Sequence, residues 1–223
     1  MNTTEAEVRS NNKVHGPYKR GSGSRVPSVT TIIGGVLAKP ALIKWAHGLG
    51  LKGIDMDSYR DELADIGKLA HRMILDHLRG NKTDTTHYSP AQVDLAENAF
   101  IKYLEWEKGH RVEPVLIEQP LVSELHGFGG TPDFYGKVDD VWTIIDYKTG
   151  KGIYFEYWLQ LAAYHELIKE TMGAEATTTF RVLNIGRNET EQFVEEVKTD
   201  LGVYWSIFWH TLCIYDLKKA MDK

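Results

Sequence analysis

Residues 130–150 read GTPDFYGKVDDVWTIIDYKTG, and they hold the strongest structural signal in the chain. Phe134–Val138 and Val141–Tyr147 are rich in β-branched and aromatic residues, which favour strands. Asp139-Asp140 lies between the two runs and is typical of a two-residue turn. The stretch therefore predicts a β-hairpin whose strands pair outward from these two aspartates.

This register sets two carboxylates against each other. Asp133 faces Asp146 at the open end of the hairpin, and directly opposed side chains lie about 5 Å apart at Cβ. At an effective dielectric constant near 20, the two charges repel by about 3 kcal/mol, so a cation or a shifted pKa is needed. Lys148 lies two residues beyond Asp146 and so shares its face of the strand.

Two carboxylates beside a lysine suit the hydrolysis of a phosphodiester. Carboxylate oxygens are the ligands that Mg²⁺ and Mn²⁺ prefer, and an ammonium group beside such an ion can orient a water molecule or offset charge on an oxyanion. The alternative is a surface ion pair between Lys148 and Asp146, which stabilises by less than about 1 kcal/mol. Spacing alone leaves both interpretations open.

Outward from the hairpin, helical and strand patterns alternate along the chain. Val26–Leu37 mixes β-branched residues with glycines, and its threonines fit a strand. Helices are expected over Lys39-Pro40 to His47, Ser58 to Gly80, Ser89-Pro90 to Lys108, Tyr154 to Lys169 and from Asp200 onward, and further strands over Val112–Ser123, Thr177–Ile185 and Gln192–Lys198. This order predicts one α/β domain, residues 26–223, with a central mixed β-sheet flanked by helices, after a flexible basic arm, residues 1–25.

The composition restricts the class of protein. The chain has 223 residues, of which 42% are hydrophobic and 26% charged, which suits one domain with a substantial core. No apolar run approaches the roughly 18 residues of a membrane span, and residues 1–25 show no signal-peptide pattern. Cys213 is the single cysteine, which excludes a disulfide framework and an iron–sulfur cluster held by several thiolates. We expect no membrane association and a reducing, cytoplasmic location.

The net charge of −5 is unevenly distributed. Residues 1–52 contain eight basic and two acidic residues, a net charge of +6, and the remainder carries −11. A basic segment of this kind can follow a phosphate backbone, whereas the alternative is a solvated tail. The candidate DNA contacts in and beside this segment are Arg20, Arg25, Ser28, Thr30 and Lys39.

Two motifs in the hairpin and the helix after it resemble those of the PD-(D/E)xK nuclease superfamily. Gly130-Thr131-Pro132-Asp133, followed after twelve residues by Asp146-Tyr147-Lys148, is similar to the signature that gives the superfamily its name. Gln160-Leu161-Ala162-Ala163-Tyr164 resembles the Gln-x-x-x-Tyr motif of its RecB-like branch. The resemblance implies a restriction-endonuclease-like core.

Two upstream segments extend the resemblance to about residues 26–186. Gly67–His71 resembles the helix that carries the metal-binding histidine of the RecB-like branch. Val26–Ile32, together with Lys39–Leu42, is similar to the leading segment of phage-type exonucleases. Each motif is short, but all four occur in the order that the family shows.

The resemblance implies a set of metal ligands. Asp133 and Asp146 would bind one or two Mg²⁺ or Mn²⁺ ions, with the backbone carbonyl of Tyr147 as a further ligand. His71 would supply a nitrogen ligand from its helix. Glu118 matches a carboxylate often present on the preceding strand and is a weaker candidate.

The resemblance also implies the catalytic and DNA-contacting residues. Lys148 would position or activate the attacking water, and Gln160 and Tyr164, one helical turn apart, would line the site and contact the DNA. The implied enzyme is a metal-dependent deoxyribonuclease, an exonuclease acting on linear double- or single-stranded DNA in recombination, repair or replication. Its expected setting is the cytoplasm of a bacterium or of a phage-infected cell, with a recombination or replication protein as a candidate partner.

Two alternatives remain open at this point. One is a non-catalytic DNA-binding or recombination-accessory module with the same fold, and the other is a metal-dependent phosphoesterase that acts on nucleotides or RNA. The opposed Asp133 and Asp146, with Lys148 intact, favour an enzyme over a module that has lost turnover. Residue spacing does not distinguish exonuclease from endonuclease action.

Overall fold

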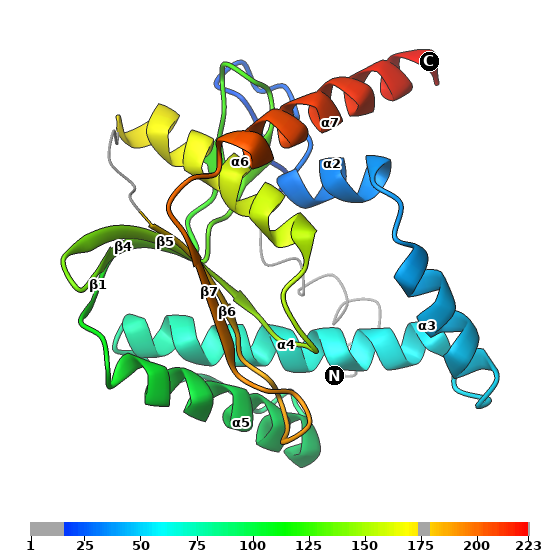
Figure 1. Ribbon diagram of the computed structural model, residues 1–223, viewed down its shortest axis with the longest axis vertical. Coiled ribbons are helices and arrows are strands. Elements are labelled where there is room, and N and C mark those ends of the chain that lie inside the picture. Colours follow the sequence, from blue (N-terminus) through cyan, green and yellow to red (C-terminus); the bar gives the residue numbers. More distant parts are fainter. Residues whose placement is uncertain (1–15, 174–178, 223) are drawn as a thin grey trace, which may run out of the picture.

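A computed structural model describes residues 16–173 and 179–222 of the chain (Figure 1). The helices are α2 (Val29–Val36), α3 (Pro40–Gly50), α4 (Met56–Leu78), α5 (Pro90–Glu107), α6 (Phe155–Met172) and α7 (Gly202–Met221). The strands are β1 (Val112–Ile117), β2 (Leu121–Val122), β3 (Gly129–Gly130), β4 (Phe134–Val138), β5 (Val141–Lys148), β6 (Thr179–Asn184) and β7 (Val194–Lys198). The predicted α/β class is confirmed.

Five strands form the central sheet in the order β1-β4-β5-β6-β7. β5 pairs in parallel with β6 and antiparallel with β4, and the outer pairs are antiparallel, so the sheet is mixed as predicted. The predicted hairpin register is confirmed, with Val138 opposite Val141 and Phe134 opposite Ile145. Asp139 and Asp140 have φ of 52° and 66°, which matches the backbone twist of a tight hairpin turn.

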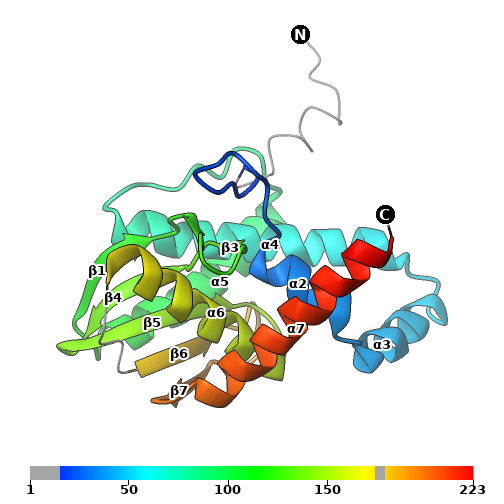
Figure 2. The ribbon, with the colours of Figure 1, turned by 90° about the horizontal axis from the view of Figure 1, so that it is seen from above.

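Helices cover both faces of the sheet (Figure 1). α4 and α5 pack on one face, where their buried apolar side chains form a cluster with Phe134, Ile145 and Tyr147. α2, α6 and α7 cover the other face, in a second cluster that includes Tyr135 and Ile144. α6 and α7 lie side by side (Figure 2). Because successive residues of β5 point to opposite faces, Asp146 and Lys148 lie on the α6 side.

Two helix starts differ from the sequence-based expectation. Val26–Leu37 is not a strand, because Ser28 caps a helix there by accepting a hydrogen bond from the backbone N–H of Thr31 at 3.0 Å. Burial of Val29, Ile32 and Ile33 on one helical face outweighs the strand propensity of the β-branched residues. The longest helix, α4, is capped by Asp55 rather than by Ser58, whose N–H is the donor.

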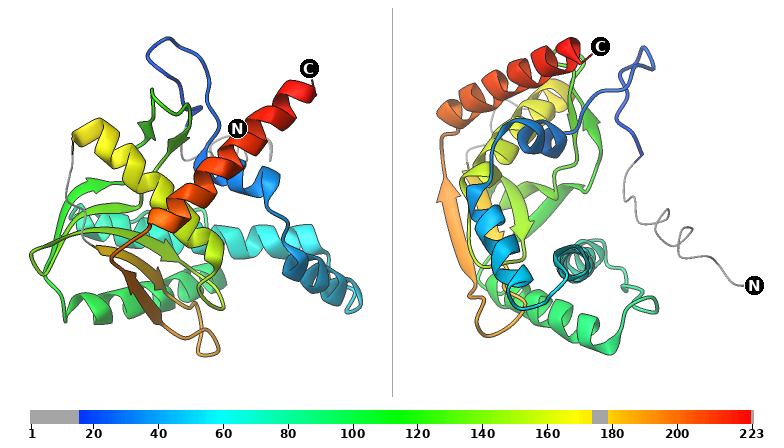
Figure 3. Two further views of the ribbon diagram at one scale, coloured as in Figure 1. Left: turned by 45° about the horizontal axis from the view of Figure 1, so that its top comes forward. Right: turned by 90° about the vertical axis from the view of Figure 1, so that its right-hand side faces the viewer.

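The predicted arm over residues 1–25 is described only from Gly16 onward. There, residues 18–26 form a short antiparallel turn, called here the N-terminal hairpin, in which the N–H of Val26 donates to the carbonyl of Tyr18 at 3.0 Å and Lys19 pairs with Arg25. Figure 3 shows this hairpin beside the loop between β2 and β3. The boundary between arm and domain stays a prediction.

Within the described residues, no single helix is long and apolar enough to cross a membrane. By length and composition alone, α2 and α3 would qualify as a pair, but they meet at a bend of 80°.

Candidate active site

Asp133 and Asp146 come together where β4 begins and β5 nears its end. Asp146 is fully buried, and one carboxylate oxygen of Asp133 accepts a hydrogen bond from the backbone N–H of Tyr147 at 2.9 Å. Burial raises the pKa of each carboxyl to about 6, against an ordinary value of 3.8. The negative charge of Asp133 adds to the rise in the Asp146 pKa, whereas Lys148 opposes it. The predicted like-charge contact is therefore present.

Lys148 connects the carboxylates to α6. Its Nζ lies 2.7 Å from Oδ2 of Asp146 and donates a hydrogen bond to Oε1 of Gln160 at 3.1 Å. Gln160 Nε2 in turn donates to the Tyr164 hydroxyl at 2.7 Å. The Tyr157 ring lies 4.8 Å from the same ammonium group, within the range of a cation–π contact. Lysine, glutamine and tyrosine thus form one polar chain, which joins the residues of the two sequence motifs.

His71 reaches the site from α4, on the other side of the sheet. Its Nδ1 lies 3.7 Å from Oδ2 of Asp133. Burial, and then the positive charge of Lys148, lower the His71 pKa to about 4, so the imidazole is neutral at pH 7. One turn earlier, a Cβ on Gly67 would meet the Thr149 hydroxyl at 2.7 Å, so the glycine permits the close approach of α4 to the end of β5.

Glu118 and an arginine that sequence reasoning missed lie at the edge of the site. The N–H of Glu118 donates to the carbonyl of Asp133 at 3.1 Å, and Glu118 has a φ of 49°, an uncommon value for a residue other than glycine. Arg79, at the end of α4, donates to the carbonyl of Ile117 at 2.7 Å and has Nη1 3.8 Å from Glu118 Oε2. No local motif marks Arg79, because its position depends on where α4 meets β1.

The side chains of the site are of the kind that bind a divalent cation. Over residues 16–173 and 179–222, no group of three or more His, Cys, Asp or Glu side chains is placed to hold a metal ion. Apart from the ion pair with Lys148, however, both buried oxygens of Asp146 lack a hydrogen-bond partner. Two such carboxylates near a neutral imidazole are suitable ligands for Mg²⁺ or Mn²⁺.

The backbone carbonyl of Tyr147, a predicted metal ligand, lies beside His71. This backbone group lies close enough to His71 to oppose the fall in the histidine pKa. The Tyr147 side chain points away from the carboxylates and is buried beside Tyr103, with ring centroids 5.6 Å apart. The edge of the Tyr147 ring also packs against His71, with ring centroids 6.1 Å apart. The role of the Tyr147 carbonyl as a metal ligand stays a prediction.

The predicted DNA contacts Ser28, Thr30, Lys39 and Arg25 lie on the N-terminal hairpin and in or beside helices α2 and α3. Ser28 forms a parallel bridge with Gly129, and its hydroxyl lies 3.1 Å from that of Thr30. Lys39 Nζ is 3.7 Å from a Glu156 carboxylate oxygen at the start of α6. Arg25 is exposed on the N-terminal hairpin. Their contact with DNA stays a prediction.

Arg20, another predicted DNA contact, lies differently from Arg25. Its guanidinium lies against Gly127, and its buried Nε has no hydrogen-bond partner among the described residues. It is therefore less available to a phosphate than Arg25 or Lys19, both of which are exposed.

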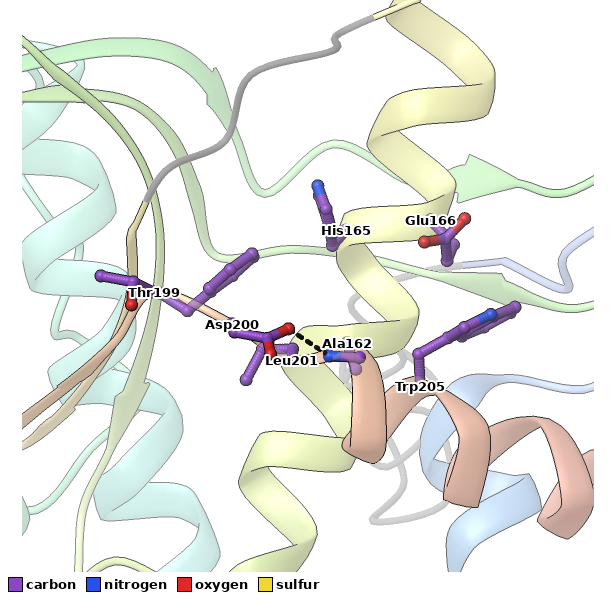
Figure 4. Close-up of a pocket in the computed structure, with 9 residues that line it drawn as sticks. Ala162, His165, Glu166, Thr199, Asp200, Leu201 and Trp205 are labelled. Carbon is purple, nitrogen blue, oxygen red and sulfur yellow. Dashed lines mark hydrogen bonds between the residues drawn. The ribbon is translucent and has the colours of Figure 1, made fainter.

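A separate cavity of about 200 Å³ lies between α6 and the start of α7 (Figure 4). Its lining includes His165 and Glu166 of α6, with Asp200 and Trp205 opposite. These α6 residues lie on the face opposite Gln160 and Tyr164, since about 3.6 residues make one helical turn. Asp200 accepts a hydrogen bond from the N–H of Gly202 at 2.7 Å, and Glu166 pairs with Lys169 at 3.0 Å. The cavity contains none of the predicted site residues.

Comparisons with known proteins place this geometry in a family. Residues 42–201 match the model of the PD-(D/E)XK nuclease superfamily. No match was found among curated proteins. A solved structure of a candidate exonuclease from Eubacterium rectale is similar at 15% identity and a TM-score of 0.47, over 66% of this chain. This chain covers 63% of that protein's length.

A second solved structure has a smaller likeness. An alkaline exonuclease from Laribacter hongkongensis is similar at 17% identity and a TM-score of 0.33, over 72% of this chain and 91% of that one. The segment matched by the family model contains the polar residues that meet at the candidate site, which are His71, Asp133, Asp146, Lys148 and Gln160.

Proposed function

Since the chain belongs to the PD-(D/E)XK nuclease superfamily, we propose that it is a divalent-metal-dependent deoxyribonuclease that degrades linear DNA from an end. The observation that supports this best is the pair of opposed carboxylates of partly buried Asp133 and buried Asp146, with Lys148 in contact with Asp146 and hydrogen-bonded to Gln160. A domain kept only for binding would gain stability by replacing one carboxylate, because burial of like charges is costly.

Each side chain has a role that follows from its contacts. Asp133 and Asp146 would hold the metal, with neutral His71 and the Tyr147 carbonyl as further ligands. The bound ion, Mg²⁺ or Mn²⁺, supplies a polarised phosphoryl oxygen and a more acidic water. Lys148 is directed by Gln160 and lies close enough to Asp146 to orient that water.

Gln160 and Tyr164 line the α6 side of the site. The hydrogen bond between them fixes the amide so that its oxygen faces Lys148. Because Tyr164 is buried, a DNA strand lying along this face would meet Gln160 and the exposed basic side chains of the N-terminal hairpin, Lys19 and Arg25. The proposed substrate is linear DNA, in recombination, repair or replication.

A direct assay tests the proposal. Purified protein is incubated with end-labelled linear DNA and with closed circular DNA, each with Mg²⁺, with Mn²⁺ or with EDTA. We expect degradation of the linear DNA only, and only with a divalent ion. Absence of metal-dependent cleavage of every DNA form would rule out the enzyme in favour of a binding module, and cleavage of closed circles would rule out the exonuclease mode. Cleavage of RNA in preference to DNA would point to the phosphoesterase alternative.

The N-terminal hairpin gives a prediction about substrate capture. In the double variant Lys19→Ala/Arg25→Ala, we expect KM for DNA to rise several-fold at low salt while kcat changes little. Both side chains are exposed on the hairpin, so they can bind the DNA without taking part in the reaction. Loss of two phosphate contacts should also reduce the slope of log affinity against log salt by about 2.

A matched pair serves as the control for this prediction. Lys108, at the end of α5, and Lys219, near the end of α7, are exposed and lie away from the hairpin. Lys108→Ala/Lys219→Ala removes the same charge and should leave KM unchanged. An equal effect of both double variants would mean that net charge, not the hairpin, governs DNA capture.

A further inference from the structure

The N-terminal hairpin is attached to the chain segment that leads into Asp133. The N–H of Gly21 donates to a carboxylate oxygen of Glu124 at 2.6 Å, and the N–H of Gly129 donates to the carbonyl of Pro27 at 2.9 Å. These contacts join residues about a hundred positions apart in the sequence. They fix the hairpin against the loop between β2 and β3 (Figure 3).

Tyr18 forms the closest of these contacts. A Cβ on Gly129 would lie 2.4 Å from Cγ of the Tyr18 ring, so the ring lies directly on the glycine backbone. On the next residue, a Cβ on Gly130 would lie 2.6 Å from the Tyr164 ring of α6. The two glycines are thus held between two tyrosines, and neither position has room for a side chain.

The Tyr18 hydroxyl makes a further contact, closer in the sequence to Asp133. It lies 2.7 Å from the hydroxyl of Thr131, in hydrogen-bond contact. Thr131 is buried, with 8% of its surface exposed, and only Pro132 separates it from Asp133. Because proline fixes one of its two backbone dihedrals, displacement of Thr131 is passed on to Asp133 with little loss.

Asp133 needs such a restraint because its neighbour repels it. Its carboxylate faces that of Asp146, accepts a hydrogen bond from the Tyr147 N–H at 2.9 Å and lies 3.7 Å from His71. Its backbone carbonyl accepts one from the Glu118 N–H at 3.1 Å. One hydrogen bond of ordinary strength contributes only about 1 kcal/mol, less than the repulsion of about 3 kcal/mol between opposed carboxylates. The positive charge of Lys148 offsets part of this repulsion, and contacts that hold the backbone before Asp133 add to the restraint.

We propose that Tyr18 is a positioning residue, which holds Asp133 opposite Asp146 through its hydrogen bond to Thr131. This role rests on the proposed function, because it matters only if the two carboxylates bind a metal ion together. Tyr18 touches neither carboxylate. It acts through the backbone of residues 129–132, which it and Tyr164 enclose.

A double-mutant cycle tests this role with metal binding as the readout. Mn²⁺ affinity is measured by titration calorimetry for the full chain and for Tyr18→Phe, Thr131→Val and the double variant. We expect each single variant to bind Mn²⁺ about fivefold more weakly, as loss of one hydrogen bond implies. The double variant should be no weaker than either single one, because both remove the same bond.

Two further variants separate positioning from folding. Thr131→Ser keeps the hydroxyl and should retain the affinity of the unchanged chain. Tyr59→Phe removes a tyrosine hydroxyl at the far end of α4 and should also have no effect. Unchanged Mn²⁺ affinity in Tyr18→Phe and Thr131→Val, or effects that simply add, would overturn the positioning role while leaving the proposed function intact.

Failure of the proposed function has a different signature. If the unchanged chain itself binds no Mn²⁺, then the metal-dependent nuclease and the positioning role are both overturned. Steady-state kinetics distinguish the Tyr18→Phe variant from the charge variant Lys19→Ala/Arg25→Ala. Tyr18→Phe should lower kcat at saturating DNA with KM nearly unchanged, the reverse of the expectation for Lys19→Ala/Arg25→Ala, and a pure rise in KM would contradict the role.

Discussion

Replacement of Lys148 by alanine is expected to abolish DNA cleavage without weakening Mn²⁺ binding. The ammonium group lies 2.7 Å from Asp146 and is held by Gln160, so the substitution removes a cation from the centre of the site. Loss of a group that orients a nucleophile or stabilises developing charge lowers kcat by about 100- to 1000-fold. Gel assays with labelled linear DNA at saturating Mn²⁺ measure this effect.

The metal response of this variant separates catalysis from assembly of the site. Lys148 competes with a metal ion for the Asp146 carboxylate, so Lys148→Ala should bind Mn²⁺ at least as tightly as the unchanged chain. Lys108→Ala, which removes an exposed lysine from the end of α5, is the matched control and should cleave normally. Retention of more than about a tenth of the activity in Lys148→Ala would mean that the lysine is only a counter-charge.

Replacement of Asp133 by asparagine is expected to stabilise the metal-free protein and to abolish both its response to metal and its activity. The amide oxygen can still accept the hydrogen bond from the Tyr147 N–H, while the repulsion from Asp146 disappears. Burial raises the Asp133 pKa to about 6 from 3.8, which corresponds to about 1–3 kcal/mol of destabilisation at neutral pH. In EDTA, the melting temperature should rise by about 5 °C.

The direction of the pH dependence follows from the raised pKa. Between about pH 4 and pH 6, the metal-free folded chain binds a proton at Asp133 that the unfolded chain has already released, so its stability increases as pH falls through 6. Asp133→Asn removes the contribution of Asp133 to this dependence and leaves that of Asp146, whose pKa burial also raises. The advantage of the variant should therefore be full above pH 6 and vanish below about pH 4, as thermal denaturation in EDTA at each pH would show.

Addition of Mn²⁺ should reverse the order of the melting temperatures of the unchanged chain and Asp133→Asn. Millimolar Mn²⁺ is expected to raise the melting temperature of the unchanged chain, because the ion binds only the folded state, and to leave Asp133→Asn unaffected. A variant that melts lower in EDTA, or that still responds to Mn²⁺, would contradict the assignment of Asp133 as a metal ligand.

Asp139 offers a matched control on the same hairpin. It lies in the turn, where hydrogen bonds from His110 and from the backbone of Arg111 lower its pKa. Its ionised form is favoured by the fold, so Asp139→Asn should leave stability unchanged or reduce it, opposite in sign to Asp133→Asn. Asparagine tolerates the positive φ of 52° at this position, so backbone strain does not confuse the comparison.

The sequence alone determined the centre of the site. The two-residue turn at Asp139-Asp140 set the hairpin register, because the length of a turn fixes which residues of the two strands face each other. That register placed Asp133 opposite Asp146 and Lys148 on the same face, and helical spacing placed Gln160 and Tyr164 one turn apart. The structure has all of these relationships.

Other features were decided by the tertiary structure. The sequence suggested a strand near Val26–Leu37, where packing against α6 and α7 instead buries one face of a helix. Arg79 beside Glu118, and Tyr18 beside Thr131, join segments that are far apart in the chain. Local periodicity reports only how neighbouring residues are arranged, so it could identify the carboxylates but not the side chains that hold them in place.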